Sequence, residues 1–171
     1  MTDQHEWIAG LVKQYEKPLC RYAFSLTGEV AAAQDAVQET FLRLCKANRA
    51  RVEGHEAAWL FRVCRSRVFD MKRKEKPMHA LTPQHEALIA SPEPSPDAAA
   101  MHQDKDDVLP NLMASLPDRQ REVIRLKFQQ NLSYREIARV MNLSESNVGF
   151  IIHTGIKTLR ENMKQLQGAL S

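Results

Sequence analysis

The sequence of 171 residues contains few cysteines, and their arrangement suggests neither a disulfide framework nor a metal site. Cys20, Cys45 and Cys64 are odd in number and widely spaced, and no Cys-x-x-Cys pair or matching histidine spacing accompanies them. Each falls on the apolar stripe of an expected helix. We therefore predict three buried thiols in a reducing compartment, with a redox-sensing role for one of them as the alternative.

The chain also lacks a long uninterrupted apolar run at its start. The stretch MTDQHEWIAGLVKQYEK carries charges throughout, which argues against both a signal peptide and a membrane span. We expect a cytoplasmic protein with no membrane insertion.

Signatures of catalysis are missing as well. The six histidines are scattered, no order of serine, histidine and acid stands out, and no glycine-rich phosphate loop occurs. The sequence predicts no catalytic residue, no metal ligand and no cofactor, and therefore a protein that is not an enzyme.

Helical spacing is what the sequence does contain. Apolar residues recur at intervals of three and four, whereas no stretch alternates as a strand would, so the predicted fold class is all-α. The first expected helix ends near Gly28 and has Pro18 as a site for a kink. Two more follow, over 30–47 and 57–74, and the three helices form the first of two small domains, residues 1–75.

Residues 76–107 interrupt this pattern. They show no sustained period, are mostly acidic and hold five of the eight prolines, which is typical of a flexible linker. About 30 residues can extend to roughly 100 Å at some 3.3 Å each, so the two domains need not touch.

The second domain, residues 108–171, has the spacing of a helix-turn-helix. Residues that start or stop helices occur at fitting places: Pro117 in a first turn, Ser133 with Glu136 as a capping box, Asn142 as a left-handed stop and Ser144 as a cap.

Positive charge is gathered on the third expected helix, although the net charge of +3 is mild. Seven cations between positions 62 and 76 oppose only Asp70 and Glu75, and such a strip attracts phosphates. The strip lies beside Trp59 and Phe61, and an exposed ring suits unstacked bases. The alternatives are a solvated charged face and a core position for Trp59.

Three motifs followed by the helix-turn-helix resemble an extracytoplasmic-function (ECF, group IV) sigma factor, the smallest type of promoter-recognition subunit of bacterial RNA polymerase. DAVQETFLRL (35–44) looks like the region 2 segment that docks on the polymerase. AWLFRVCRSRVFDMKRK (58–74) looks like the promoter-melting and minus-10 helix, and LPDRQREVIRLKF (116–128) looks like the start of region 4.

The resemblance implies a domain organisation and a function. Residues 1–75 would be sigma region 2, residues 76–107 a linker and residues 108–171 sigma region 4, with no region 3 between them. The chain would bind core RNA polymerase and promoter DNA, direct transcription initiation at minus-35 and minus-10 elements, and be held inactive by an anti-sigma factor.

The resemblance also implies which residues carry out each role. Core polymerase binding is expected from Asp35, Gln38, Glu39, Phe41 and Arg43. Contacts with minus-10 DNA are expected from Asn48, Arg49, Arg51, Trp59, Arg62, Arg65, Lys72 and Arg73. Contacts with minus-35 DNA are expected from Arg135, Ser144, Ser146, Asn147, Phe150, His153, Thr154 and Lys157.

The second helix of the helix-turn-helix departs from the family pattern. Its first turns usually carry Lys and Arg, whereas this chain has Gly149 and Ile151 there. Ile151 is expected to border the core, and Gly149 to let the backbone approach DNA closely. Four apolar residues should bury one side of the helix against Ile137 and Met141: Val148, Ile152, Ile156 and Leu159. With so few charges, this domain alone should bind DNA weakly and with a shallow salt dependence.

Two other classes of protein remain possible on the sequence. One is a helix-turn-helix transcriptional regulator without sigma activity, whose first domain would serve dimerisation or sensing. The other is a helical adaptor that binds only proteins. The polymerase motif at 35–44 and the basic helix favour the sigma factor, because a plain repressor has no need of them.

Overall fold

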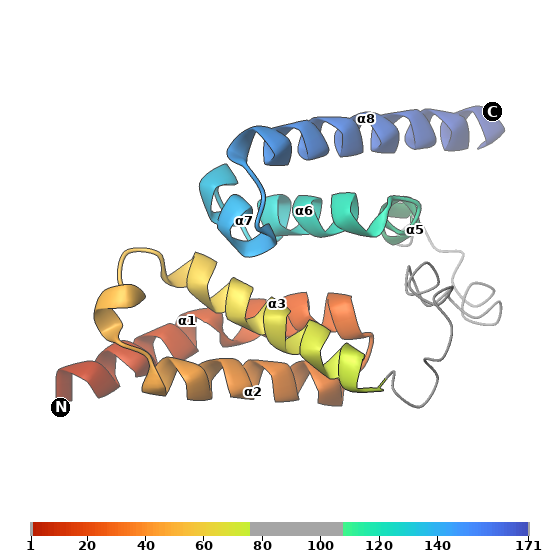
Figure 1. The fold of residues 1–171 in the computed structure, drawn as a ribbon. Helices are drawn as coiled ribbons and strands as arrows, with labels where there is room; N and C mark the ends of the chain where they lie inside the picture. Colours follow the sequence, from red (N-terminus) through yellow and green to blue (C-terminus); the bar gives the residue numbers. More distant parts are fainter. Residues whose placement is uncertain (1, 76–107, 171) are drawn as a thin grey trace.

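The computed structural model describes residues 2–75 and 108–170, which form two helical lobes (Figure 1). Every regular element in these two ranges is a helix, which confirms the all-α fold class. The predicted linker, 76–107, lies outside the described residues.

The first lobe consists of α1 (Thr2–Thr27), α2 (Val30–Lys46) and α3 (Glu56–Glu75). Pro18 lies inside α1 and does not end it. Gly28 does end it: its φ of 74° is left-handed, and its N–H donates to the Phe24 carbonyl at 2.8 Å. This is the usual way for a glycine to stop a helix, and it turns the chain into α2.

The inner side of α2 explains why one cysteine prediction is wrong. Its buried residues follow a spacing of three and four: Ala33, Ala36, Val37, Thr40 and Leu44. Cys45 comes one position after Leu44, about 100° further around the helix, and is exposed. Cys20 is half-buried and Cys64 is buried as predicted, and burial raises the pKa of the Cys64 thiol to about 12.

The second lobe consists of α5 (Val108–Ala114), α6 (Asp118–Phe128), α7 (Tyr134–Met141) and α8 (Glu145–Leu170). The predicted capping box is present, since Ser133 Oγ accepts the Glu136 N–H at 3.1 Å and Glu136 accepts the Ser133 N–H at 3.2 Å. Asn142 ends α7 at a φ of 55°. Pro117 stands at the N-cap of α6, one residue earlier than the predicted first turn.

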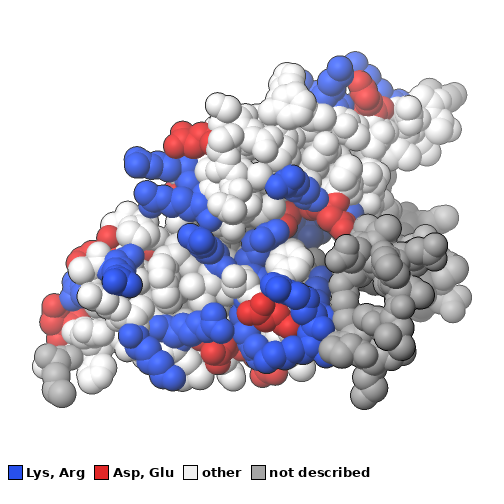
Figure 2. All heavy atoms as spheres, viewed as in Figure 1, with Lys and Arg blue, Asp and Glu red and all other residues white. Residues whose placement is uncertain are grey.

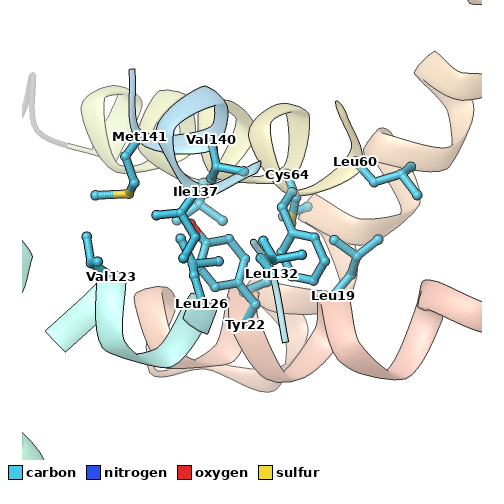
Figure 3. Close-up of a cluster of buried hydrophobic side chains, with 14 of the residues drawn as sticks. Leu19, Tyr22, Leu60, Cys64, Val123, Leu126, Leu132, Ile137, Val140 and Met141 are labelled. Carbon is cyan, nitrogen blue, oxygen red and sulfur yellow. The ribbon is translucent and has the colours of Figure 1, made fainter. Parts of the chain in front are cut away.

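The two lobes pack against each other, with α7 lying on α3 (Figure 1). The same hydrophobic cluster includes Leu19, Leu60 and Cys64 of the first lobe and Leu126 and Ile137 of the second (Figure 3). The sequence left the lobes free to separate, whereas here they share a core. This junction, meaning the contact of α1 and α3 with α6 and α7, places the candidate site residues relative to each other.

The two glycines of α8 that lie nearest its start should respond differently to a methyl group. At Gly149 an added Cβ would meet the Tyr134 ring at 3.5 Å, an ordinary contact, so Gly149→Ala should raise the free energy of unfolding by up to about 1 kcal/mol through helix propensity. At Gly155 the Cβ would lie 2.5 Å from the buried Ile124 Cδ1, so the overlap should cancel that gain. Urea unfolding measures both; equal stabilisation by the two variants would contradict the close packing of α8 on α6.

Candidate functional site

The outer face of α2 is a composite of carboxylates and apolar surface. Asp35 and Gln38 are exposed, and Leu42 beside them is 57% exposed. Glu39 and Arg43 pair along the helix at 3.3 Å. Phe41 is half-buried and packs against the core, so it supports this face from beneath. Since the opposite side of α2 is buried, this face is free to meet another protein.

The loop between α2 and α3 is held in shape by the residues predicted to contact DNA. Asn48 caps the short 3₁₀ turn Arg49–Arg51, because its Oδ1 accepts the Ala50 N–H at 3.0 Å. Arg49 pairs with Asp3 at 2.7 Å and Glu53 at 2.9 Å. In the described structure these two side chains therefore organise the loop, whereas Arg51 is exposed.

The basic strip of α3 is arranged around an aromatic ring that the sequence pattern did not single out. Phe61 is 1% exposed and part of the core, and Trp59 is half-buried against that core. Phe69 is the ring between the cations, with Arg65 Cζ 4.6 Å and Lys72 Nζ 5.7 Å from its centroid. The intervals of four and three from 65 to 69 to 72 place these side chains on one helical face, and that signal was available in the sequence.

The remaining minus-10 candidates on α3 point into solvent. Arg62 and Arg73 are both exposed, and Arg73 pairs with Asp70 at 3.1 Å. Figure 2 shows Lys and Arg side chains over the face of the first lobe and along its junction with the second.

Arg65 is held by the second lobe. Glu122 of α6 is 8% exposed, and its Oε1 accepts the Arg65 Nε–H at 2.7 Å and the Tyr22 hydroxyl at 2.6 Å. Burial would lower the pKa of Arg65, but the hydrogen bond and charge of Glu122 outweigh it and raise that pKa. Burial, followed by the Glu122 charge, raises the pKa of Tyr22 well above its ordinary value. Tyr22, Arg65 and Glu122 are called the Glu122 network below.

A hollow of about 390 Å³ lies beside the Glu122 network. Cations from both lobes line it, with Arg65 and Lys72 on α3 and with Arg119, Arg121 and Arg125 on α6. The pKa of Arg125 is lowered by burial and by the nearby charge of Arg121. The junction therefore brings like charges of the two lobes together around one buried carboxylate.

Helix α8 has a buried side and an exposed side, which is the arrangement that a DNA-recognition helix needs. Val148, Ile151 and Ile152 are buried, which confirms that Ile151 borders the core. Ile156 is half-buried against the cluster that contains Ile137 and Met141, as predicted. Leu159 is half-buried against a second cluster, formed by Met113, Leu116 and Ile124, so the prediction that it packs on Ile137 and Met141 is wrong. The exposed candidates lie on the outer side: Ser146, Asn147, Phe150, His153 and Lys157, with Thr154 half-buried next to them.

The other candidates of the helix-turn-helix lie at the start of α8 and on α7. Ser144 Oγ accepts the Asn147 N–H at 3.1 Å and so caps α8, while Arg135 on α7 is exposed. A Cβ added at Gly149 would lie 3.5 Å from the Tyr134 ring, so this ring occupies the space beside the glycine through which the sequence suggested a close approach to DNA. Tyr134 itself is 42% exposed, and Lys127 Nζ lies 5.3 Å from the centroid of its ring. These two residues were not predicted from the sequence.

The described residues contain neither a cluster of metal ligands nor a membrane-spanning helix. Within 2–75 and 108–170, no three His, Cys, Asp or Glu side chains converge as metal ligands. No helix in those ranges has the length and apolar character needed to span a membrane.

Comparisons with known proteins match both lobes to one family. Residues 11–77 match the family model of sigma-70 region 2, and residues 106–159 match that of sigma-70, region 4. The ECF RNA polymerase sigma factor SigL of Mycobacterium tuberculosis is 30% identical over 161 residues, covering 91% of this chain and 88% of that protein. SigM of Bacillus subtilis is 28% identical over 151 residues, covering 88% of this chain and 91% of that protein.

Solved structures show the same fold. RpoE of Bartonella quintana, solved with the anti-sigma factor NepR, aligns with a TM-score of 0.65 at 20% identity over 91% of this chain and 96% of that chain. CnrH, solved with the cytosolic domain of CnrY, aligns with a TM-score of 0.61 at 21% identity over 94% of this chain and 90% of that chain. With both sigma regions matched and a relative of 30% identity aligned over most of its length, the chain belongs to the ECF RNA polymerase sigma factors, which recognise promoters.

Proposed function

We propose that this sigma factor binds core RNA polymerase through the outer face of α2 and reads promoter DNA with α3 and α8. The outer face of α2 carries the proposal. Exposed Leu42 stands there beside the carboxylates of Asp35 and Glu39, on a helix whose other side is already buried. Such a face suits a protein partner, whereas a repressor that acts through its helix-turn-helix has no use for it.

Contact with the minus-10 element is assigned to the loop before α3 and to the cations of α3. Arg51, Arg62 and Arg73 are exposed and can meet phosphates directly. Arg65 and Lys72 both lie over the Phe69 ring, and a base that displaces either cation can stack on this ring while the cation binds a phosphate. Asn48 and Arg49 support this surface by fixing the loop.

Contact with the minus-35 element is assigned to the exposed side of α8. Asn147 can pair with an adenine edge, and Phe150, which is 67% exposed, can contact a thymine methyl group. His153 and Lys157 extend the same side, but cations are few, so little of the affinity comes from phosphates. Region 4 should therefore need polymerase to hold it at the promoter.

The same proposal assigns a role to each part of the chain, a cellular location and a regulatory partner. Residues 1–75 act as region 2 and residues 108–171 as region 4, joined by 76–107. The chain works in the cytoplasm, catalyses no reaction itself and requires no cofactor, because chemistry belongs to the polymerase. The structures of RpoE with NepR and of CnrH with CnrY support a partner that holds this chain inactive, and we propose an anti-sigma factor.

Promoter-specific transcription with purified core polymerase tests the proposed function. The parent chain should support run-off transcription from its own promoters with no other sigma factor present. Asp35→Lys with Glu39→Lys should abolish both run-off transcription and copurification with core polymerase, because it reverses the charge of the proposed docking face.

The control for this test is Glu6→Lys with Glu16→Lys, which makes the same change in net charge on exposed positions of α1. It should leave transcription intact, and circular dichroism should show full helicity for both double variants. A parent chain that transcribes only when a second sigma factor is added would identify a regulator instead.

The outer side of α8 makes a separate prediction. Asn147→Ala or His153→Ala should lower minus-35-dependent run-off transcription by about 5- to 150-fold, since one lost base contact costs on the order of 1 to 3 kcal/mol. Templates with the minus-35 element scrambled should respond less, because the lost contact is absent from them already.

Lys164→Ala provides the matched control, because Lys164 is exposed on the same helix but lies three turns beyond His153. If the Asn147 and His153 variants transcribe like the parent on every minus-35 sequence tested, the outer side of α8 does not read DNA.

A further inference from the structure

Glu122 is the one charged side chain that is buried among the described residues. It belongs to α6 of region 4, yet both of its partners belong to region 2. Tyr22 donates its hydroxyl proton at 2.6 Å from α1, and Arg65 donates from α3 at 2.7 Å, with a second nitrogen at 3.5 Å. The Glu122 network therefore exists only while the two lobes are in contact.

The surroundings make the junction depend on this carboxylate. Arg65 and Lys72 of α3 face three arginines of α6 across the hollow, and Asp118 is the other carboxylate in its lining. Arg121 is already bonded to Asp118 and to main-chain carbonyls of its own lobe. Without the charge of Glu122, the contact would bring cations together with too little to balance them.

Ion pairs of this kind favour reversible contacts. A buried pair adds little net stability compared with two hydrated ions, but removal of one partner leaves the other buried and uncompensated. Separation of the lobes returns Glu122 and Arg65 to water together, so the pair determines which faces meet without fixing them permanently.

The closed arrangement obstructs one DNA surface and leaves the others open. The exposed sides of α2 and α8 face away from the junction, whereas α7 lies over α3 (Figure 1). Arg65 of α3 is hydrogen-bonded to Glu122 and is therefore not available to DNA. The positions minus-35 and minus-10 differ by about 25 base pairs. At about 3.4 Å for each pair, the two elements lie roughly 85 Å apart along B-DNA. Helix α8, with 26 residues, spans only about 39 Å. Helix α7 contacts both α3 and α8, and packed helices lie about 8–10 Å apart, so the closed form cannot occupy both elements.

We propose that Glu122 closes the free sigma factor by binding Arg65 in the place that a minus-10 phosphate takes in the open form. A carboxylate and a phosphate both pair with the planar guanidinium group, so the second lobe competes with DNA for the same cation. The inference rests on the proposed role of α3 at the minus-10 element. It makes Glu122 a regulatory residue of region 4 that acts on region 2.

The test compares the parent with Glu122→Gln and, separately, Tyr22→Phe. Tyr22→Phe removes only the hydroxyl and keeps the ring contact with Phe61, at 5.3 Å between centroids, so it should fold. Small-angle X-ray scattering of the free full-length chains should show the radius of gyration rising by roughly 5 Å in Glu122→Gln, as one compact body becomes two. Tyr22→Phe should show a smaller increase.

Binding of a short DNA single strand of mixed sequence is the second measurement. Glu122→Gln should bind about tenfold more tightly than the parent, because a larger share of the chains is open. Its log-log salt dependence should be steeper by about 0.7, the contribution of one further phosphate contact on a single strand. In an Arg65→Ala background, the same Glu122→Gln change should leave the salt dependence unaltered, since no cation is released.

Glu161→Gln serves as the control, because it removes one exposed carboxylate from the same lobe. If Glu122→Gln expands the chain no more than this control, the closing role of Glu122 is wrong, whatever the outcome of run-off transcription. If the chain expands but DNA binding and its salt dependence match the control, the competition for Arg65 is wrong. If neither parent nor variants bind the strand while expansion occurs, the proposed role of α3 fails and the closing contact stands.

Discussion

Helix α3 has to bury two of its sides, and the first lobe can cover only one. One side packs on α1 and α2, while α7 of the second lobe covers another. Helix α7 is only eight residues long, and four of them, Ile137, Ala138, Val140 and Met141, are buried. Removing apolar surface of this extent from water favours contact between the lobes. The covering of α3 and the exposure of α2 and α8 follow from this shared burial, but the contact also places Arg65 at the junction, where Glu122 has to balance its charge.

The sequence predicted the helices well because their periodicity and caps are local. The capping box at Ser133 and the left-handed stop at Asn142 depend only on neighbouring residues. The predictions that the structure corrected depend on direction or on distant contacts. Cys45 lies one position after a buried leucine, at the edge of the apolar stripe, where a turn of about 100° decides between core and solvent. The Glu122 network joins residues 57 and 100 positions apart, which no spacing rule links.

The candidate site shows the same division. The ridge on α2 and the outer side of α8 could be read from helical spacing, and the structure places their predicted residues mostly at the surface. Arg49 and Arg65 look alike in sequence, as cations near a DNA-binding helix, but the structure gives them different partners. Arg49 is tied within its own lobe, whereas Arg65 pairs across the junction. Only the second pair couples the position of one lobe to the chemistry of the other.

The distance between the lobes tests most directly whether a closed free form gives way to an open bound form. Labels introduced at Lys46 on α2 and Lys164 on α8, both exposed, can report it by resonance energy transfer. The free chain should give one short distance, and the complex with core polymerase and promoter DNA should lengthen it by tens of ångströms, toward the roughly 85 Å between the two elements. The same distance in the free chain and in the complex would contradict the closed resting state.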